Sequence, residues 1–454
     1  MGATPWSGRR LHFIGVGGAG MSGLALVARA LGAEVTGSDR AESSYCERLR
    51  AAGVEPAIGH DAANVPASGE VVVSTAIAED NPELAAARAG GLSVLHRGDL
   101  LGEVSRLRRS IAVAGTHGKT TTASMAAHIL LACGRDPSYL IGGELRTTGA
   151  NAAWGEGEWL VVEADESDRS FLKLAPEVAV VTNVELDHHA TFHSLWELEA
   201  AFAKFVRPAA ALVLWEGVGA DVLGGRAGPG TVTFGIDHGH VRATELVLDG
   251  AGSRSRVGDA VLELSVPGRH NVLNALAAIA ACEQAGVSRE EGAAALRDFS
   301  GAGRRFEPHG ATPSGARVYD DYAHHPTEVR ATLEAARTLG PERLVACFQP
   351  HLYSRTRHLH RRFGEALALA DLVVVLEVYP ARERAEDFPG VSGWLVAGSA
   401  AEAAGGRPVY WTPRMEDAER LLRSELREGD VLVTLGAGDV DGLARRLVEQ
   451  PVAA

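Results

Sequence analysis

A glycine-rich turn carrying a lysine and a run of threonines lies at residues 111–122, IAVAGTHGKTTT. Backbone N–H groups of such a turn bind a phosphate from the N-terminus of the helix that follows. Lys119 would then reach the terminal phosphates, and the Thr120 hydroxyl would coordinate Mg²⁺. The turn is a variant of the usual spacing, because Val113 stands where its first glycine is expected. The segment therefore predicts a nucleotide-phosphate site.

A second glycine-rich turn, GVGGAG at residues 15–20, follows an earlier apolar run and opens a helix. It fits the pattern G-x-G-x-x-G, and Asp39 follows Gly20 by 19 residues, a spacing typical of dinucleotide-binding domains. By itself this pattern indicates an oxidoreductase. The fingerprint specifies a pyrophosphate on a helix N-terminus, however, so any nucleotide diphosphate satisfies it. Both interpretations stay open at this point, beside close packing of strand and helix without a ligand.

Carboxylates and a histidine follow two later apolar runs. VVEADESD contains Glu163, Asp165, Glu166 and Asp168, and TNVELDHH contains His188. So many carboxylates close together are costly unless they are solvated or bound to a metal. Since parallel strands bring their carboxyl ends to one edge of a sheet, we expect Thr120, Glu163 and His188 to converge around Mg²⁺. Taken singly, each is more often a surface acid or a satisfied histidine.

Apolar strand-like runs alternate with Ala- and Leu-rich helical stretches along the chain, which is the α/β pattern. A length of 454 residues suggests about three domains of roughly 150 residues each. We place their boundaries at 1–108, 109–303 and 304–454. The apolar runs predict strands at 11–16, 34–39, 70–77, 159–165, 178–184, 343–351, 371–379 and 430–439. The Ala- and Leu-rich stretches predict helices at 21–31, 81–89 and 271–285. Residues 217–266 read as a small β insertion.

Composition and charge exclude several classes of protein. The chain has 44 basic and 58 acidic residues, a net charge of −14, which argues against a nucleic-acid partner. Four scattered cysteines without a CxxC pair indicate a reduced, cytoplasmic protein with neither disulfides nor zinc. The sequence contains no run of 18 apolar residues, so we expect no membrane insertion.

Considered together, the motifs resemble the Mur ligases of peptidoglycan synthesis. The segments that carry the resemblance run in family order from residue 15 to residue 440: GVGGAGMSGLA with VTGSD, AGTHGKTTT, EADESDRSFLKL with TNVELDH, PGRHNVLNALAA, FSGAGRRFE, DDYAHHPTEV, FQPHLYSRT and LGAGDV. The resemblance implies an α/β fold of three domains. The N-terminal domain is Rossmann-like and binds a UDP-sugar, the central one is P-loop ATPase-like with a mixed sheet, and the C-terminal one is Rossmann-like and binds an amino acid.

The resemblance also implies an activity. With ATP and Mg²⁺, the lactyl carboxylate of UDP-N-acetylmuramate becomes an acyl phosphate, which L-alanine then attacks. The alternative within the family attaches a recycled murein tripeptide to the same UDP-sugar, but GVGGAGMSG and EADESDRS favour alanine. A non-catalytic nucleotide sensor is a further alternative, although it has no reason to keep the acids and an amino-acid pocket.

The site residues carried over from the family fall into five groups. Those for the UDP-sugar are Gly15, Gly17, Gly18, Gly20, Asp39, Ser74 and Thr75. Those for ATP are Gly115, Thr116, Gly118, Lys119, Thr120, Thr121, His270, Asn271, Asn274, Arg305 and Asp321. Those for alanine are Tyr322, His324 and Arg355, and those for the metal are Thr120, Glu163 and His188. The residues expected in catalysis are Lys119, His188 and Arg305. Asn271 and Asn274 have an alternative interpretation, as an ordinary helix N-terminal cap.

The sequence departs from the family pattern at several of these motifs. Ala190 and Phe192 replace an Asp and a Tyr that relatives often carry after the metal histidine, and His189 adds a second histidine beside it. Leu352 stands where some relatives have an Arg, so the alanine carboxylate is bound by Arg355 alone or by Arg355 with help from Arg357.

Overall fold

The computed structural model describes residues 4–189, 191–218, 223, 230–250 and 252–449, and its chain separates into two compact units. The first comprises Met1–Val184, Trp196–Arg242 and Ala275–Ala295, and the second comprises Glu185–Leu195, Ala243–Asn274 and Leu296–Ala454. Ala190 lies outside the described residues, as do 219–222, 224–229 and 251 within the predicted β insertion. Among the described residues, no helix has both the length and the apolar character needed to cross a membrane.

The first unit begins with a parallel sheet in the order β3-β2-β1-β4-β5. Its strands are β1 (Arg10–Ile14), β2 (Glu34–Asp39), β3 (Ala57–Ile58), β4 (Glu70–Val73) and β5 (Ser93–His96). The connecting helices are α1 (Ala19–Ala30), α2 (Ser44–Ala51), η1 (Ala62–Asn64), α3 (Pro82–Ala89) and α4 (Arg97–Ser105). The strand order reverses between β1 and β4, and ligands of such sheets bind at the carboxyl ends beside that reversal. The Rossmann-like prediction for this region is confirmed.

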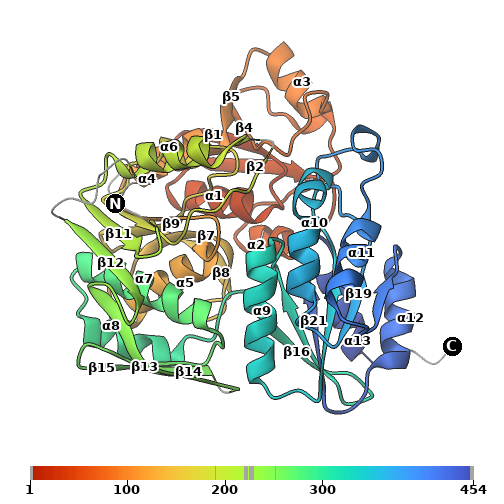
Figure 1. Cartoon of the computed structure of the whole chain (residues 1–454). Helices are drawn as coiled ribbons and strands as arrows, with labels where there is room; N and C mark the ends of the chain where they lie inside the picture. Colours follow the sequence, from red (N-terminus) through yellow and green to blue (C-terminus); the bar gives the residue numbers. More distant parts are fainter. Residues whose placement is uncertain (1–3, 190, 219–222, 224–229, 251, 450–454) are drawn as a thin grey trace. The chain divides into compact units, whose positions relative to one another are not determined.

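In a second, mixed sheet, the strands that lie in the same unit follow the order β12-β11-β10-β6-β9-β7-β8, with β8 antiparallel to β7. Its strands are β6 (Arg109–Ala114), β7 (Ser138–Leu145), β8 (Ala150–Ala153), β9 (Trp159–Glu163), β10 (Val178–Val181), β11 (Ala211–Trp215) and β12 (Thr231–Ile236). The helical segments are α5 (Lys119–Ala132), η2 (Ser170–Lys173), α6 (Leu195–Val206), α7 (Arg269–Gln284) and α8 (Arg289–Ala295), of which α7 begins in the second unit. The central strand β6 leads directly into the glycine turn that precedes α5, the helix labelled in Figure 1.

The two sheets of the first unit are joined by packing and by polar contacts. Helix α1 packs against the hairpin of β7 and β8, where Asn151 donates its Nδ2 to the carbonyl oxygen of Ala19 at 2.6 Å. Arg48 of α2 forms an ion pair with Glu144 of β7. The predicted boundary after residue 108 therefore falls inside one compact unit, because side chains from the two sheets meet on either side of it. The domain boundaries themselves stay predictions.

The second unit is built on a sheet in the order β16-β17-β21-β18-β19-β20, parallel except for the edge strand β16. Its strands are β16 (Glu307–Ala311), β17 (Arg317–Asp321), β18 (Arg343–Phe348), β19 (Leu372–Val375), β20 (Val409–Trp411) and β21 (Asp430–Leu435). The helical segments are η4 (Leu296–Asp298), α9 (Pro326–Thr338), α10 (Tyr353–Leu367), η5 (Ala385–Asp387), α11 (Gly393–Ala403), α12 (Met415–Glu425) and α13 (Asp441–Val448).

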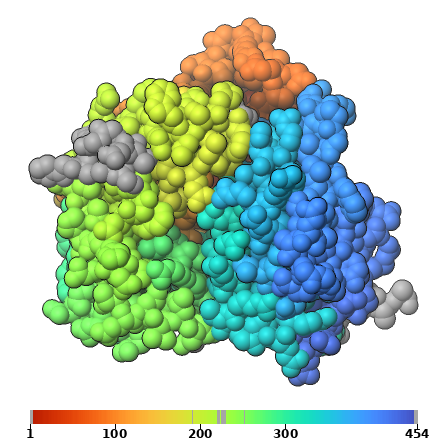
Figure 2. All heavy atoms as spheres, in the orientation of Figure 1, coloured from red at the N-terminus to blue at the C-terminus, as the bar shows by residue number. Residues whose placement is uncertain are grey.

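Apolar clusters cover both faces of this sheet. Helices α9, α10 and α11 pack on one face, and α12 and α13 pack on the other. The outer surfaces of α9 to α11 form the cyan-to-blue face visible in Figure 2. Strand β13 (Val241–Asp249) leads from the first unit into an antiparallel meander with β14 (Gly252–Val257) and β15 (Ala260–Leu264). The α/β class predicted from the sequence is confirmed in both units.

Several strands are shorter than the sequence predicts at their carboxyl ends. The strands expected at 70–77, 159–165, 178–184 and 371–379 end at Val73, Glu163, Val181 and Val375. Ser74, Asp165 and Thr182 follow three of these ends and lie in loops instead of in the strands.

Candidate active site

The glycine turn after β6 is held open by residues that follow the neighbouring strand β10. The amide of Thr116 donates to the carbonyl of Asn183 at 3.2 Å, and the amide of His117 donates to the Asn183 side chain at 2.8 Å. Thr182 donates its hydroxyl to the carbonyl of His117 at 2.6 Å. Gly118 adopts a left-handed conformation (φ +80°) and immediately precedes α5, whose N-terminus no side chain caps within the described chain. The first turn of α5 thus has the backbone arrangement that is able to bind an anion.

Lys119 is the first residue of α5, and its ammonium is folded back over the turn. Its Nζ donates to the carbonyls of Gly115 at 2.7 Å and Thr116 at 3.3 Å, and it lies 2.9 Å from Oε2 of Glu166, which is 1 % exposed. Burial lowers the pKa of Lys119, but the carboxylates of Glu166, Asp165 and Glu163 outweigh it and raise the pKa above its ordinary value. The ammonium is therefore charged and already positioned in the turn.

Two of the three predicted metal ligands meet beside that turn. The Thr120 hydroxyl donates to Oε1 of Glu163 at 3.0 Å, and Oε2 of Glu163 accepts from the amide of Gly142 at 2.7 Å. A hydroxyl and a carboxylate form an oxygen donor set of the kind that Mg²⁺ prefers. Thr121 is buried in the same first turn of α5. His188 belongs to the second unit, so its part in a metal site stays a prediction.

The glycine turn after β1 is built differently. The amides of Gly15 and Val16 both donate to the carbonyl of Ser38, and the amide of Gly17 donates to Oδ2 of Asp39 at 2.8 Å. Asp39 therefore braces the turn with one carboxylate oxygen. A Cβ atom on Gly17 would lie 3.0 Å from that oxygen and 2.8 Å from Sγ of Cys46, so the backbone approaches its support as only glycine allows.

The residues predicted after β4 lie beside this first turn. A Cβ atom on Gly15 would contact the side chain of Ile77 at 3.0 Å, and Ile77 donates its amide to the carbonyl of Ser74 at 3.1 Å. Thr75 is exposed in the same bend. The structure thus brings Gly15, Ser74 and Thr75 to one edge of the sheet, at the point where its strand order reverses. Their assignment to a UDP-sugar is not tested by this geometry.

The segment HNVLN lies inside α7 rather than in front of it. Asn271 donates its Nδ2 to the carbonyl of Pro267 at 2.7 Å, and Asn274 donates to Oδ1 of Asn271 at 3.3 Å. An N-terminal cap accepts from helix amides, whereas Asn271 donates backwards, so the cap interpretation is wrong. Burial lowers the pKa of His270 to about 4, which keeps its imidazole neutral at pH 7.

Two adjacent arginines in the segment before β16 have different surroundings. Arg304 donates to Asp320 at 3.0 Å and to the carbonyls of Gly436 and Gly438, which fixes it to the C-terminal sheet. The guanidinium groups of both arginines lie over the ring of Tyr322, each 5.1 Å from its centroid. Arg304 is therefore a structural residue, and Arg305 remains the predicted phosphate ligand.

Asp321 ends β17 and fastens the same segment to the sheet. Its Oδ2 accepts from the amide of Phe306 at 2.9 Å, and its Oδ1 accepts from the amide of Ala323 at 2.7 Å. Burial raises the pKa of Asp321 to about 6, although the charge of Arg305 opposes that shift.

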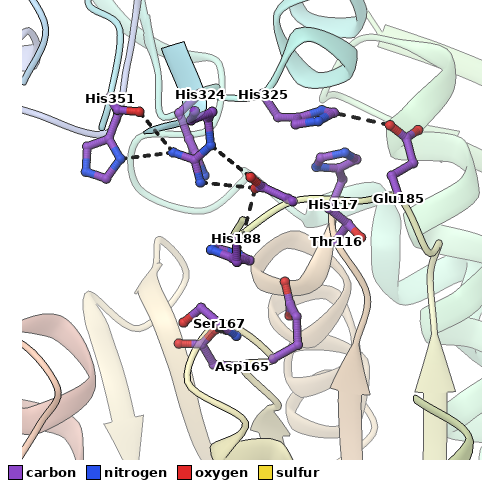
Figure 3. Close-up of polar contacts among 12 residues, drawn as sticks. Thr116, His117, Asp165, Ser167, Glu185, His188, His324, His325 and His351 are labelled. Carbon is purple, nitrogen blue, oxygen red and sulfur yellow. Dashed lines mark hydrogen bonds and ion pairs between the residues drawn. The ribbon is translucent and has the colours of Figure 1, made fainter. Parts of the chain in front are cut away.

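The three residues predicted to hold alanine are connected through His351, which the sequence did not predict. The ring of Tyr322 meets that of His324 edge-on at 5.3 Å, and His324 meets His351 at 5.9 Å. His351 Nδ1 lies 3.0 Å from Nη1 of Arg355. Burial lowers the pKa values of His324 to about 4 and of His351 to about 2, so both rings are neutral at pH 7. Figure 3 shows both histidines among the polar contacts of this region.

Arg355 is engaged by a carboxylate of the chain itself. Its Nε and Nη2 donate to Oδ1 and Oδ2 of Asp187 at 2.9 and 3.1 Å, with both side chains almost fully buried. Burial raises the pKa of Asp187, but the neighbouring guanidinium of Arg355 outweighs it and holds the pKa well below its ordinary value. A guanidinium that binds one carboxylate through two nitrogens has the geometry to bind the carboxylate of a ligand in the same way.

The positions that depart from the family pattern are packed into the fold. Phe192 is fully buried, and its amide donates to the carbonyl of His188, which has a left-handed backbone (φ +53°). His189 stacks on His358 of α10 with the ring centroids 4.6 Å apart. Leu352 is buried with φ +69°, a conformation that is strained for a side chain with a Cβ.

Sequence reasoning missed the supporting residues of both sites. Thr182 and Asn183 follow β10, His351 follows β18, and Asp187 precedes the predicted metal histidine. A usable signal was present, since each polar residue comes directly after, or a few residues beyond, an apolar strand. The missing information was the order of the strands in the sheet, which decides which strand ends are neighbours.

The sequence matches three family descriptions in succession. Residues 10–109 match the description "Mur ligase family, catalytic domain", 113–282 match "Mur ligase middle domain" and 304–438 match "Mur ligase, glutamate ligase domain". A UDP-N-acetylmuramate–L-alanine ligase of Rubrobacter xylanophilus is 47 % identical over 451 residues, which cover 97 % of this chain and 99 % of the relative.

Solved structures agree with the sequence matches. The UDP-N-acetylmuramate–alanine ligase of Thermotoga maritima superposes with a TM-score of 0.82 at 32 % identity, covering 97 % of this chain and 98 % of that chain. A murein peptide ligase of Psychrobacter arcticus superposes with a TM-score of 0.75 at 29 % identity, covering 98 % and 100 %.

Proposed function

Because the chain belongs to the Mur ligase family, we propose that it joins L-alanine to the lactyl carboxylate of UDP-N-acetylmuramate and converts ATP to ADP and phosphate. The observation that carries the proposal is the 47 % identity with a ligase of that name over nearly the whole of both chains. The oxidoreductase interpretation gives no role to the buried pair of Lys119 and Glu166 or to the pair of Thr120 and Glu163.

In the first half-reaction a lactyl carboxylate oxygen attacks the γ-phosphorus of ATP, and the bond to the β-phosphate oxygen breaks. Transfer of a phosphoryl group depends mostly on positioning and on neutralising charge. Lys119 supplies a fixed positive charge, since two carbonyls and Glu166 hold its ammonium before any ligand arrives. When bound, Mg²⁺ would neutralise phosphate oxygens, and Thr120 and Glu163 are the residues that would hold it.

In the second half-reaction the neutral alanine amine attacks the carbonyl of the acyl phosphate. The bond from that carbon to the phosphate oxygen breaks, and the departing phosphate takes up the proton released from the nitrogen. We assign the alanine carboxylate to the guanidinium fork of Arg355, in exchange for Asp187. His324 is neutral at pH 7 because its pKa is lowered to about 4, so it accepts a hydrogen bond from the alanine amine rather than repelling its charge.

The second candidate is attachment of a murein tripeptide to the same UDP-sugar. It is favoured by the likeness to the murein peptide ligase of Psychrobacter arcticus, whose TM-score is 0.75. The two candidates share the phosphoryl transfer and differ in the size of the acceptor.

The test is phosphate release from ATP with Mg²⁺ and UDP-N-acetylmuramate, comparing L-alanine, the murein tripeptide and no acceptor. We expect release with L-alanine and a product heavier by one alanyl residue in mass spectrometry. Phosphate release only with the tripeptide would support the second candidate function, attachment of the tripeptide. Release with neither acceptor would contradict both.

Arg355→Ala tests the assignment of the alanine carboxylate. We expect the KM for alanine to rise about 10- to 100-fold, the value of a lost charge-assisted hydrogen bond, with a small change in the KM for ATP. Arg357→Ala is the matched control, because this arginine lies on the same helix over the ring of Phe388. Equal increases in the KM values for alanine and for ATP would mean that Arg355 stabilises the fold by pairing with Asp187 and does not bind alanine.

A further inference from the structure

The acidic segment after β9 contains two carboxylates that bind one arginine from a distant part of the sequence. Asp165 and Asp168 both bind Arg97, the first residue of α4, in the N-terminal part of the chain. Arg97 Nη2 lies 2.7 Å from Oδ2 of Asp165 and 3.0 Å from Oδ2 of Asp168, and its Nε donates to the same oxygen of Asp168 at 3.3 Å. One arginine is thus held in a fixed orientation by two acids.

The third nitrogen of that guanidinium is directed at the first glycine turn. A Cβ atom on Gly20 would lie 3.2 Å from Nη1 of Arg97, and Nη1 has no hydrogen-bond partner among the described residues. The backbone of Gly20 is helical, so its conformation does not require a glycine. The absence of a side chain at Gly20 therefore leaves space under the guanidinium.

The space beside Gly20 is lined by hydrogen-bond donors that suit an anion. Helix α1 has no acidic residue in its first turn, and no side chain caps its N-terminus. The amides of Gly15, Val16 and Gly17 are already used, which leaves those of Ala19, Gly20 and Met21 in the first turn of the helix. Asp165 and Asp168 balance the charge of Arg97, and an anion in this space would accept hydrogen bonds from Nη1 and from the first-turn amides of α1.

We propose that Arg97 is a binding residue for the diphosphate of the UDP-sugar, held over the first glycine turn by Asp165 and Asp168. The proposal rests on the proposed function and names a contact of its sugar-nucleotide site. Asp165 and Asp168 are then positioning residues. They lie on either side of Glu166, which holds Lys119 in the second turn. One short segment therefore holds a cation at each of the two glycine turns.

The experiment measures binding of UDP, UMP and uridine to the full chain by isothermal titration calorimetry. For Arg97→Ala we expect the affinity for UDP to fall about 10- to 100-fold while that for uridine is unchanged. Arg97→Lys keeps the charge without the fork and should lose less. Arg106→Ala is the matched control, because Arg106 follows the same helix and contacts the carbonyl of Lys173 rather than the acids beside the turn.

The outcomes separate the inference from the function on which it rests. Equal losses for UDP and uridine in both Arg97 variants, or no loss in either, would overturn the inference while the wild-type chain still prefers UDP. A wild-type chain that binds UDP no better than uridine would overturn the inference and the sugar-nucleotide site together. If Arg97→Ala fails to fold, Arg97→Lys still decides, since loss confined to UDP supports the inference and unchanged binding contradicts it.

Discussion

The two glycine turns of the first unit have the same place between a strand and a helix, but the positive charge beside each turn comes from a different part of the chain. Each follows a central strand of its sheet and opens a helix that no side chain caps. In the turn at 15–20 most amides bond to the chain itself, and the nearby cation comes from another helix. In the turn at 115–121 the cation belongs to the turn, since Lys119 is the first residue of α5.

The buried carboxylates beneath the two turns differ in the same way. Glu83, fully buried, accepts from Ser38 at 2.7 Å and Asn64 at 2.9 Å, with two histidines completing its shell. Glu166, equally buried, pairs with the lysine of the turn itself. Glu83 is thus bonded to the surrounding fold, whereas Glu166 holds a cation inside its turn, which is the arrangement that stabilises a transferring phosphoryl group.

Lys119→Ala gives the largest expected difference between the turns. We expect kcat to fall about 10³-fold or more, because the transferring phosphoryl group loses its fixed cation. Binding of UDP should be nearly unchanged, since the first turn does not contain this residue. Phosphate release and UDP calorimetry on the same preparation measure the two effects.

The control for that variant addresses folding. Removing Lys119 leaves Glu166 buried without its ammonium partner, so the double variant Lys119→Ala with Glu166→Gln separates lost charge from lost stability. Normal turnover by either variant would contradict the view that the second glycine turn supplies a charge needed for turnover and the first does not.

Gly115→Ala should affect stability more than any single glycine change in the first turn. Gly115 has φ +140°, and a Cβ there would lie 2.0 Å from Oγ1 of Thr182. We expect the free energy of unfolding to fall by about 4 kcal/mol from strain and collision together. Gly18→Ala is the matched control, because its φ is −78° and its nearest contact is 3.6 Å away. Similar melting temperatures for the two variants would contradict this contrast.

Glu83→Gln tests the support of the first turn through its dependence on pH. Burial raises the pKa of Glu83, but hydrogen bonds from His12, Asn64 and Ser38 outweigh it and lower the pKa to about 2. Since this value lies below that of the unfolded chain, the carboxylate stabilises the fold above about pH 4.5, by on the order of 3 kcal/mol. That contribution is lost as the pH falls towards 2. The gap in melting temperature between wild type and variant should therefore be wide at pH 7 and narrow in acid, and a gap that does not depend on pH would refute this account.

Some of the site was predictable because it is local in the sequence. The turn IAVAGTHGKTTT predicts its strand, its helix and the roles of its backbone from consecutive residues, and β6 and α5 lie where that pattern puts them. The pairing of Thr120 with Glu163 was also accessible, because parallel strands bring their carboxyl ends together.

Other parts depend on contacts that no local pattern encodes. The sequence predicted a carboxylate for Arg355 but not that Asp187 would occupy it, 168 residues away along the chain. The acidic run EADESD predicted a metal site, yet Asp165 and Asp168 bind Arg97 instead. The sequence shows how many charges need an opposite partner, and the tertiary structure decides which residue that partner is.

The sequence by itself determined the α/β class, the two glycine turns and the list of residues able to do chemistry, since these follow from periodicity and from residue types at short spacing. Only the tertiary structure decided which strand ends are neighbours, and hence that Thr182 and Asn183 brace the second turn while Arg97 lies over the first. The reason is physical: a strand order brings residues together across long separations in sequence, and a hydrogen bond or ion pair forms only where the distance is right.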